Sequence, residues 1–384
     1  MLDNGKAEGV RKIKRFEKYC LKDIATVSQG FTFSRSYQGK KNLKWNYFKV
    51  ADIGINPNSK YLTNAINTIS DITMEEIGAL PFPKGSIVFP RVGAALFNNN
   101  KKILAQDGVV DDNVLVLTVT DTSKCWYEFL YYYLQGIPLA KWCNSGLVPV
   151  INTKTVLSQM VFLPPLPEQQ KIAAILSTQD KVIELKEKLL AQKQQQKKYL
   201  MQQLLTGKKR LPGFNEKWRF AKLENVSKYS ASAASFKTYE SHLGCGPYPV
   251  YDASGCFGNI DFYENEQPYI SIVKDGAGAG RVALCKEKSS TIGTLGCIFA
   301  NDIDLLYLFY CMSAVDFQIY SNGSTIPHVY YKDYKNMVLY LPCELEQKAI
   351  VEILSAADHE IDLLQKSIEA EKQKKKALMQ LLLT

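Results

Sequence analysis

The chain has 384 residues, of which 46% are hydrophobic and 22% are charged, and it carries a net charge of +9. This composition excludes a low-complexity or disordered chain and predicts two or three globular domains. No apolar run approaches the roughly 18 residues of a membrane span, so we expect no membrane partner. The nine scattered cysteines include no C-x-x-C motif, which favours free thiols and a cytoplasmic location over a disulfide framework.

The first segment of the chain is expected to mix strands with short helices. After a polar arm at residues 1–13, the stretch CLKDIATVSQGFTF (20–33) predicts a short helix that leads into a strand. Strands are then expected at 45–53 (WNYFKVADI), 83–93 (PKGSIVFPRVG), 111–119 (DDNVLVLTV) and 160–165 (MVFLPP), and a buried helix at 126–135 (WYEFLYYYLQ).

Residues 163–206 are predicted to form one long helix. Pro167 suits the first helical position and Glu168 suits the positive end of the helix dipole. No glycine or proline interrupts residues 172–205, and Gly207 then ends the helix. Apolar pairs recur every seven residues, as in a coiled coil. About 39 helical residues would extend roughly 58 Å.

This helix occurs twice in the chain. At an offset of 178 residues, 21 of the 44 positions are identical between residues 163–206 and 341–384. Each helix could pack on its own domain. Alternatively, the two helices pair antiparallel, which buries both apolar stripes and relates the two halves by a pseudo-twofold axis. A polar gap in the stripe, at 196–197 and 374–375, would then offer a contact site for a partner protein.

The second half of the chain repeats the plan of the first. Strands are expected at 248–254, 268–276 and 280–285, and a helix at 304–312. Leu21 and Ile24 match Leu223 and Val226, whereas IVFPRVG and SIVKDGAG align only at an offset of 184. We therefore predict an α+β fold with domains at 1–162 and 211–340 and long antiparallel coiled-coil-like helices at 163–210 and 341–384.

Signatures of catalysis are missing from the sequence. There is no G-x-x-x-x-G-K-[ST] phosphate-binding loop, and the run GAGAG at 276–280 favours a tight turn over a dinucleotide site. No Asn/Asp-Pro-Pro-aromatic motif of an amino-methyltransferase occurs. His242 and Cys245 lack a second ligand pair at zinc-binding spacing, so no metal site is expected. These absences favour a non-catalytic protein that binds no cofactor of its own.

Three motifs of the chain resemble those of a known family. They are the long helix with EQ, ILS…D and LMQQLLT, the segment YPVYDASG…IVKDGAGAGRV, and the loop GSTIPH…KDYKN. Together they resemble the specificity subunit of type I restriction-modification systems, over essentially the whole chain. One departure is Pro-Cys-Glu-Leu-Glu-Gln at 342–347, where the first copy has Pro-Pro-Leu-Pro-Glu-Gln.

The resemblance implies partners and a division of labour. Two target recognition domains would each read one half of a bipartite site on double-stranded DNA. The paired helices would set the spacing between the halves. Two modification subunits would carry S-adenosylmethionine, and two restriction subunits would use ATP and Mg²⁺. Because the two domains differ in sequence, the site is expected to be asymmetric, with half-sites centred about 34–36 Å apart, one turn of DNA.

Candidate DNA-contacting residues were chosen for their polar or basic side chains in expected loops and helix ends. The first domain is the more basic, since residues 1–167 carry a net charge of +7 and residues 211–343 carry −2. The candidates are Arg35, Tyr37, Arg91, Asn98, Asn99, Asn100, Lys101, Lys102, Asn152 and Lys154 in the first domain, and Ser254, Asn259, Lys274, Arg281, Ser324, His328, Tyr331 and Lys332 in the second. For the cluster NNNKK at 98–102, a solvated turn is an equal alternative.

Three other functions remain open from the sequence. The chain could serve a related type II system, whose partner subunits differ. It could be a coiled-coil scaffold whose two domains bind something other than DNA. A fused methyltransferase would require S-adenosylmethionine binding, for which no motif is present.

Overall fold

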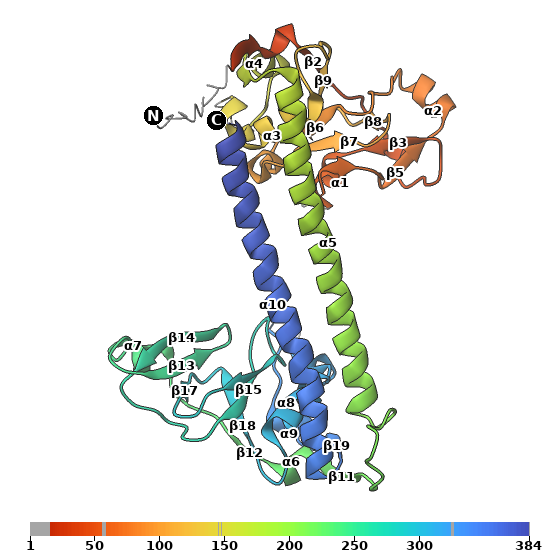
Figure 1. Ribbon diagram of the computed structural model, residues 1–384. Coiled ribbons are helices and arrows are strands. Elements are labelled where there is room, and N and C mark those ends of the chain that lie inside the picture. Colours follow the sequence, from red (N-terminus) through yellow and green to blue (C-terminus); the bar gives the residue numbers. More distant parts are fainter. Residues whose placement is uncertain (1–15, 56–58, 145, 147, 324–325, 384) are drawn as a thin grey trace, which may run out of the picture. The chain divides into compact units, whose positions relative to one another are not determined.

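The computed structural model describes residues 16–55, 59–144, 146, 148–323 and 326–383 (Figure 1). The chain divides into two compact units, unit 1 with residues 1–188 and 366–384 and unit 2 with residues 189–365. Both crossings between the units fall inside long helices, α5 (Leu166–Leu204) and α10 (Glu344–Leu383). Each unit therefore contains half of each helix, and the predicted α+β fold with two long helices is confirmed.

Unit 1 contains three sheets. The largest has the strand order β2 (Ala25–Gln29), β9 (Val114–Val119), β6 (Ile87–Pro90), β7 (Lys102–Leu104), β4 (Tyr61–Leu62). The second has the order β5 (Asn67–Ile69), β3 (Trp45–Phe48), β8 (Val109–Val110). In the third, β1 (Glu17–Cys20) pairs antiparallel with β10 (Met160–Leu163). This last pair closes the domain just before α5 begins.

The helices of unit 1 are short apart from its share of α5 and α10. They are α1 (Val50–Ile55), α2 (Asp71–Glu76), α3 (Tyr127–Gln135) and α4 (Thr153–Leu157), with 3₁₀ turns at Leu21–Asp23, Arg35–Tyr37, Ala94–Asn98 and Leu139–Trp142. The apolar face of α3 packs against Ile172 and Leu176 of α5 in one core.

The single strand expected at 45–53 is wrong in its second half, which is α1. The buried Asp52 side chain accepts hydrogen bonds from the Lys49 N–H (2.7 Å) and the Ile66 N–H (2.8 Å). These bonds satisfy a backbone donor at the start of α1 and hold the turn in place, so local capping overrides the strand-like pattern.

Unit 2 repeats the sheets of unit 1. Its largest sheet has the order β12 (Ser227–Ser230), β18 (Leu295–Ala300), β15 (Tyr269–Val273), β16 (Val282–Cys285). The second has the order β14 (Gly255–Ile260), β13 (Tyr248–Asp252), β17 (Ser290–Thr291). The third pairs β11 (Arg219–Lys222) with β19 (Val338–Leu341). Among the described strands, β4 alone lacks a counterpart, so the predicted internal repeat is confirmed in the strand order.

Each short helix of unit 2 has a counterpart in unit 1, whereas α1 and α2 of unit 1 have none in unit 2. The short helices of unit 2 are α6 (Leu223–Val226), α7 (Phe236–Glu240), α8 (Leu305–Ser313) and α9 (Tyr331–Tyr334), with a 3₁₀ turn at Phe317–Tyr320. Leu223 and Val226 are buried as their counterparts Leu21 and Ile24 are. This agrees with the match made from sequence.

The repeat has one register that differs from the sequence alignment. Phe89 pairs with Leu115 in unit 1 and Ile272 pairs with Gly296 in unit 2. These strand pairings relate β6 and β15 by an offset of 183, so the offset of 184 is wrong by one residue. The side chains of a strand alternate between its two faces, and an alignment one residue out would exchange those faces. With the corrected offset, the counterpart of Arg91 is Lys274.

The long helices pair antiparallel within each unit. In unit 1, Lys186 forms an ion pair with Glu371 (2.8 Å) and Glu187 with Lys372 (3.0 Å). In unit 2, Lys193 pairs with Glu360 (2.7 Å). Along α5, positions 180 and 186 of unit 1 pair with 375 and 371, and positions 193 and 197 of unit 2 pair with 360 and 358. The partner number falls as the α5 number rises, so the antiparallel pairing expected from the duplication is confirmed.

The polar gap in the helix stripe is filled by a network that occurs once in each unit. In unit 1, the Asp180 carboxylate accepts hydrogen bonds from Lys375 Nζ (2.5 Å) and from the Tyr132 hydroxyl (2.6 Å). In unit 2, Asp358 accepts from Lys197 Nζ (2.5 Å) and from the Tyr310 hydroxyl (2.8 Å). Lys197 and Lys375 of the gap therefore bind the facing helix, and contact of the gap with a partner protein stays a prediction.

A second duplicated feature fastens each long helix to the sheet domain before it. Gln169 is fully buried, and its amide donates to the carbonyl oxygens of Lys124 (2.7 Å) and Pro164 (2.8 Å) while accepting from the Trp126 N–H (2.8 Å). Gln347 likewise donates to Pro342 (3.0 Å) and accepts from the Asp304 N–H (3.0 Å). The repeated glutamine is thus explained by buried backbone groups that it satisfies.

The ends of the long helices differ slightly from the expected bounds. α5 begins at Leu166, so Pro167 lies one position further into the first turn than expected. The helix ends before Gly207, whose φ of 68° is the left-handed conformation typical of a helix stop. The chain then returns to the start of α10, where Glu346 accepts two hydrogen bonds from Arg210 (both 2.8 Å) and one from Trp218 (2.9 Å).

Candidate nucleic-acid interface

Two segments of unit 1 that lie far apart in sequence form a loop pair, residues 91–93 after β6 and residues 149–151 before α4. The Ile151 N–H donates to the Arg91 carbonyl (2.9 Å) and the Gly93 N–H to the Pro149 carbonyl (3.0 Å). Between these bonds, Val92 and Val150 face each other as an antiparallel bridge. Gly93 has a φ of 81°, which favours glycine at this turn.

Unit 2 contains the same loop pair, residues 274–276 and 327–329. The Val329 N–H donates to the Lys274 carbonyl (2.8 Å) and the Gly276 N–H to the Pro327 carbonyl (3.0 Å). Gly276 has a φ of 94°. Here the facing residues of the antiparallel bridge are Asp275 and His328. The two loop pairs therefore share one backbone arrangement and differ in the side chains that it presents.

Accessible apolar and basic side chains border both loop pairs. Val148 and Ile326, which precede the two prolines, are 55% and 54% exposed. Lys154 and Lys332, in α4 and α9, are exposed at matching positions. Each loop pair thus combines an apolar tip with nearby positive charge, which suits the surface of a nucleic acid.

The basic residues of the loop pairs are among the candidates named from sequence. The structure brings Arg91 next to the segment that carries Asn152 and Lys154. It likewise brings Lys274 next to the segment that carries His328 and Lys332. Arg91 and Lys274 are half-buried at corresponding positions, so each half has one basic residue at the edge of its loop pair.

The His328 ring is held by its neighbours. Its Nδ1 lies 2.6 Å from a carboxylate oxygen of Asp275, and 33% of its side chain is exposed. The Tyr330 ring is nearly parallel to it, with 5.8 Å between centroids, and Lys332 Nζ lies 5.6 Å from the centroid of Tyr330. Sequence reasoning named His328 but missed Asp275, because the two lie 53 positions apart.

The side chains of Asn152 and Tyr331 both make contacts within their own domain. Asn152 caps α4, where its side-chain oxygen accepts from the Lys154 N–H (3.0 Å). The Tyr331 ring stacks on Tyr229 (4.3 Å between centroids) and packs edge-on against Tyr334. One face of Tyr331 is therefore unavailable to a base.

Three second-domain candidates lie around the turn between β13 and β14. The exposed Ser254 donates to Asp252 (2.6 Å), and Asn259 is exposed on β14. The Arg281 guanidinium donates to the Ala253 carbonyl. This bond joins the β13–β14 turn to the glycine turn that follows Asp275. Ser324 lies outside the described residues.

Arg35 and Tyr37 belong to a different part of unit 1. Arg35 is exposed at the start of a 3₁₀ turn. The Tyr37 hydroxyl donates to Glu76 (2.8 Å), and this bond raises the Tyr37 pKa. Tyr37 packs against the cluster of Phe33 and Tyr47, which is separate from the core that holds α3.

The cluster NNNKK at 98–102 is not an accessible loop. Lys101 and Lys102 are each 2% exposed, so the prediction of two solvent-facing lysines is wrong. Lys101 Nζ donates to the Asn99 side chain (2.6 Å) and the Ile137 carbonyl (2.9 Å), and Lys102 lies in β7, an inner strand of the largest sheet. Burial lowers the pKa of Lys101 to about 7 and that of Lys102 to about 8. Asn98 remains exposed and Asn100 half-buried.

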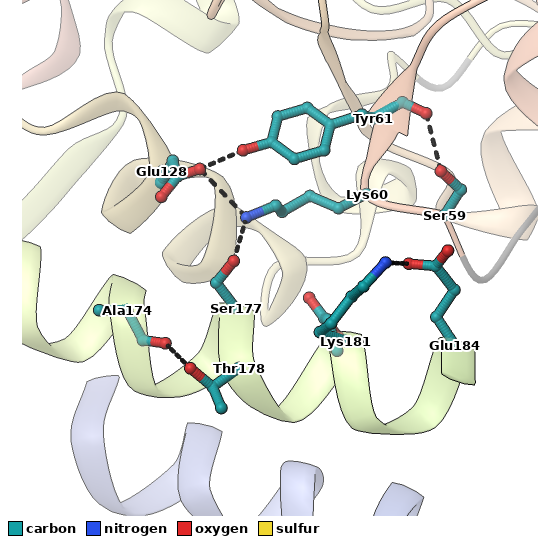
Figure 2. Close-up of a pocket in the computed structure, with 10 residues that line it drawn as sticks. Ser59, Lys60, Tyr61, Glu128, Ala174, Ser177, Thr178, Lys181 and Glu184 are labelled. Atoms are coloured by element: carbon teal, nitrogen blue, oxygen red, sulfur yellow. Dashed lines mark hydrogen bonds and ion pairs between the residues drawn. The ribbon is translucent and has the colours of Figure 1, made fainter. Parts of the chain in front are cut away.

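A cavity of about 650 Å³ lies between the sheet domain of unit 1 and α5. Figure 2 shows Lys60 reaching across it to Glu128 (3.1 Å) and Ser177 (2.8 Å), while the Tyr61 hydroxyl donates to the same carboxylate. The Lys60 side chain is only 5% exposed. Its ion pair with α3 and its hydrogen bond to α5 hold the charge of this buried lysine, which explains why it is tolerated.

Neither a metal site nor a membrane span emerges from the described ranges. No group of three or more His, Cys, Asp or Glu side chains within them could hold a metal ion. No helix in that part of the chain is both long enough and apolar enough to cross a bilayer.

Comparisons with known proteins point to one family. A family model described as type I restriction modification DNA specificity domain matches residues 13–194 and 215–372. A putative type I restriction enzyme specificity subunit (MjaX) of Methanocaldococcus jannaschii is 25% identical over 398 residues, covering 95% of this chain and 92% of that protein. The crystal structure of a type I S subunit from M. genitalium is similar in fold, with a TM-score of 0.64, 14% identity and 98% of each chain covered. A chain from a type I restriction-modification complex is also similar, with a TM-score of 0.57, 15% identity and 96% of each chain covered.

Proposed function

Because the chain belongs to the type I restriction-modification DNA specificity family and is a DNA-recognising specificity subunit, we propose that it reads a bipartite, asymmetric site with one unit per half-site. The observation that carries this proposal is the duplicated loop pair. Both copies keep the same two backbone hydrogen bonds, but one presents valines and the other an aspartate and a histidine. Two readers with a common backbone and different side chains are suited to two different half-sites.

Basic residues at matched positions would contact the DNA backbone. Arg91 and Lys154 in unit 1 correspond to Lys274 and Lys332 in unit 2. Phosphate contacts position a protein on the duplex without reading its sequence, so they can be the same in both halves. The affinity of the assembled complex for DNA should therefore fall steeply as the salt concentration rises.

The paired helices would set the distance between the half-sites. The chain passes between its units only within α5 and α10, and both helices continue through the crossing without a break. A helical connection transmits length, whereas a loop would let the spacing vary. We expect a non-specific spacer of fixed length between the two half-sites.

Catalysis and cofactors would reside in partner subunits. The family is one of specificity subunits, and the described residues offer no metal cluster. We propose that two modification subunits supply S-adenosylmethionine and methyl transfer, and that two restriction subunits supply ATP- and Mg²⁺-dependent cleavage. The duplication of the sheet domain and helix pair supports two equivalent contacts with modification subunits.

Sequencing of the methylated bases in a host that expresses this chain with its modification subunit tests the proposal. A split motif that disappears when the chain is deleted is the expected result. Exchange of residues 1–162 for the corresponding domain of another specificity subunit should change one half of the motif and leave the other intact. A continuous motif, or modification that persists without the chain, would refute the two-reader proposal.

A further inference from the structure

The two loop pairs of this chain can be compared position by position, because the same hydrogen bonds define both. Gly93 and Gly276 are identical, as are Pro149 and Pro327 and the two lysines that follow in α4 and α9. Val148 and Ile326 are both apolar and exposed to almost the same extent. Positions that are alike in both readers cannot distinguish two different half-sites.

The facing pair changes its chemistry between the two units. This pair is Val92 with Val150 in unit 1 and Asp275 with His328 in unit 2. All four residues are half-buried, so each side chain has some accessible surface. The pair lies between two backbone hydrogen bonds that fix its geometry. A position of fixed backbone and variable chemistry is what direct readout of a base requires.

Asp275 determines which hydrogen-bonding group the His328 ring presents. The carboxylate accepts from Nδ1–H at 2.6 Å, so in the neutral ring Nε2 carries the lone pair. The bond to Asp275 is the only hydrogen bond of this ring among the described residues. A neutral histidine held in this way offers an acceptor. Its natural complements on a base edge are the amino groups of adenine and cytosine in the major groove.

We propose that the facing pair is the specificity-determining pair of each reader, an inference that rests on the proposed function. Asp275 and His328 read an exocyclic amino group of adenine or cytosine in one half-site. In the other half-site, Val92 and Val150 contact the 5-methyl group of thymine, because an apolar pair can recognise that group but no hydrogen-bonding group. His328 is the contacting residue, and Asp275 is a positioning residue that acts through it.

Transplanting the valine pair tests this assignment. The double variant D275V/H328V should alter the methylated motif at one position of one half-site, with thymine accepted there about tenfold better relative to the original base. The other half-site should be unchanged. The reciprocal variant V92D/V150H should alter the other half-site alone.

A matched control is present in the same unit. His242 Nδ1 lies 3.0 Å from Asp261, and the His242 ring packs edge-on against Phe262, so it forms the same type of histidine–aspartate hydrogen bond outside the loop pair. The double variant D261V/H242V should leave both half-sites unchanged. A change in the motif comparable to that of D275V/H328V would overturn the assignment of the facing pair.

Loss of modification is also informative. If D275V/H328V still co-purifies with the modification subunit but modifies nothing, the variant H328N, which keeps an acceptor, should restore the original motif. Failure of H328N to restore it in a complex that assembles would count against the proposal, as would an unchanged motif in D275V/H328V. Failure of the proposed function is recognised separately, because modification would then persist after the whole chain is deleted.

Discussion

The duplicated aspartate network provides two copies of one interaction at different degrees of burial, and we predict different costs when each is removed. The Asp180 side chain is 16% exposed and Asp358 is 40% exposed. Both accept hydrogen bonds from a lysine on the facing helix and from a tyrosine hydroxyl. Burial raises the pKa of Tyr132, so its hydroxyl stays neutral and needs an acceptor.

The variants D180N and D358N keep the side-chain volume and remove the charge. An asparagine oxygen can accept fully from one of the two donors but cannot pair with the lysine charge. In unit 1, loss of a charge-assisted bond in a mostly buried network should cost about 2 kcal/mol. In unit 2, solvent screens the more exposed pair and the Tyr310 hydroxyl lies 3.2 Å from Ser355 Oγ, so we expect less than about 1 kcal/mol.

Hydrogen exchange resolves the two effects because each network touches a different short helix. D180N should increase local opening of α3 (Tyr127–Gln135), in unit 1, roughly 30-fold, while α8 (Leu305–Ser313) stays unchanged. D358N should affect α8 alone, by less than about fivefold. Equal effects of the two variants, or a larger effect of D358N, would refute the reasoning from burial.

Three further predictions concern other contacts. E346Q should lower stability by about 2 kcal/mol in urea unfolding, because Glu346 is only 1% exposed and its bonds to Arg210 and Trp218 weaken; a free energy unchanged within about 0.5 kcal/mol would contradict this. K101M should leave the methylated motif unchanged. The pKa of Lys101 is about 7 in the folded chain and its usual 10.5 in the unfolded chain, so the unfolded chain binds more protons between these two pH values. The free energy of unfolding of the wild type should therefore rise with pH across that range through this group. K101M should flatten this rise when it is measured by urea unfolding. Seven helical residues can be inserted into each long helix where it crosses between the units, after residues 188 and 365. This should lengthen the motif's spacer by about three base pairs without changing either half-site. An unchanged spacer would contradict the proposal that the helices set the spacing.

The repeat could be predicted from sequence because both copies have the same spacing of apolar residues and many identical residues. Long helices with Gln169 and Gln347 at matching positions, and buried tyrosines at 132 and 310, are all visible at one offset. The order of the strands was harder to predict from sequence, because a short strand such as β4, with two residues, shows too little alternation to be recognised.

The candidate interface was predicted only in part, for a physical reason. A lysine in a sequence is expected to be solvated, and nothing local shows that Lys102 will lie in an inner strand of the sheet. The partners that decide the role of a polar residue lie far away in sequence. Asp275 is 53 positions from His328, and Lys375 is 195 positions from Asp180. Such pairs depend on the tertiary fold, which residue type and spacing do not specify.

Because both helices are divided between the units, the two units are completed at different times during synthesis on the ribosome. Unit 2 is one uninterrupted stretch, whereas unit 1 needs residues 366–384 to complete its helix pair. At about 5–20 residues per second, the first half of α5 waits on the order of ten seconds or more after its synthesis for its partner helix. During that interval its apolar stripe has only the first sheet domain to cover it. The segment AQKQQQKK at 191–198, which follows in α5, is rich in glutamine and lysine, so water can hydrate this part of the helix before its partner is made.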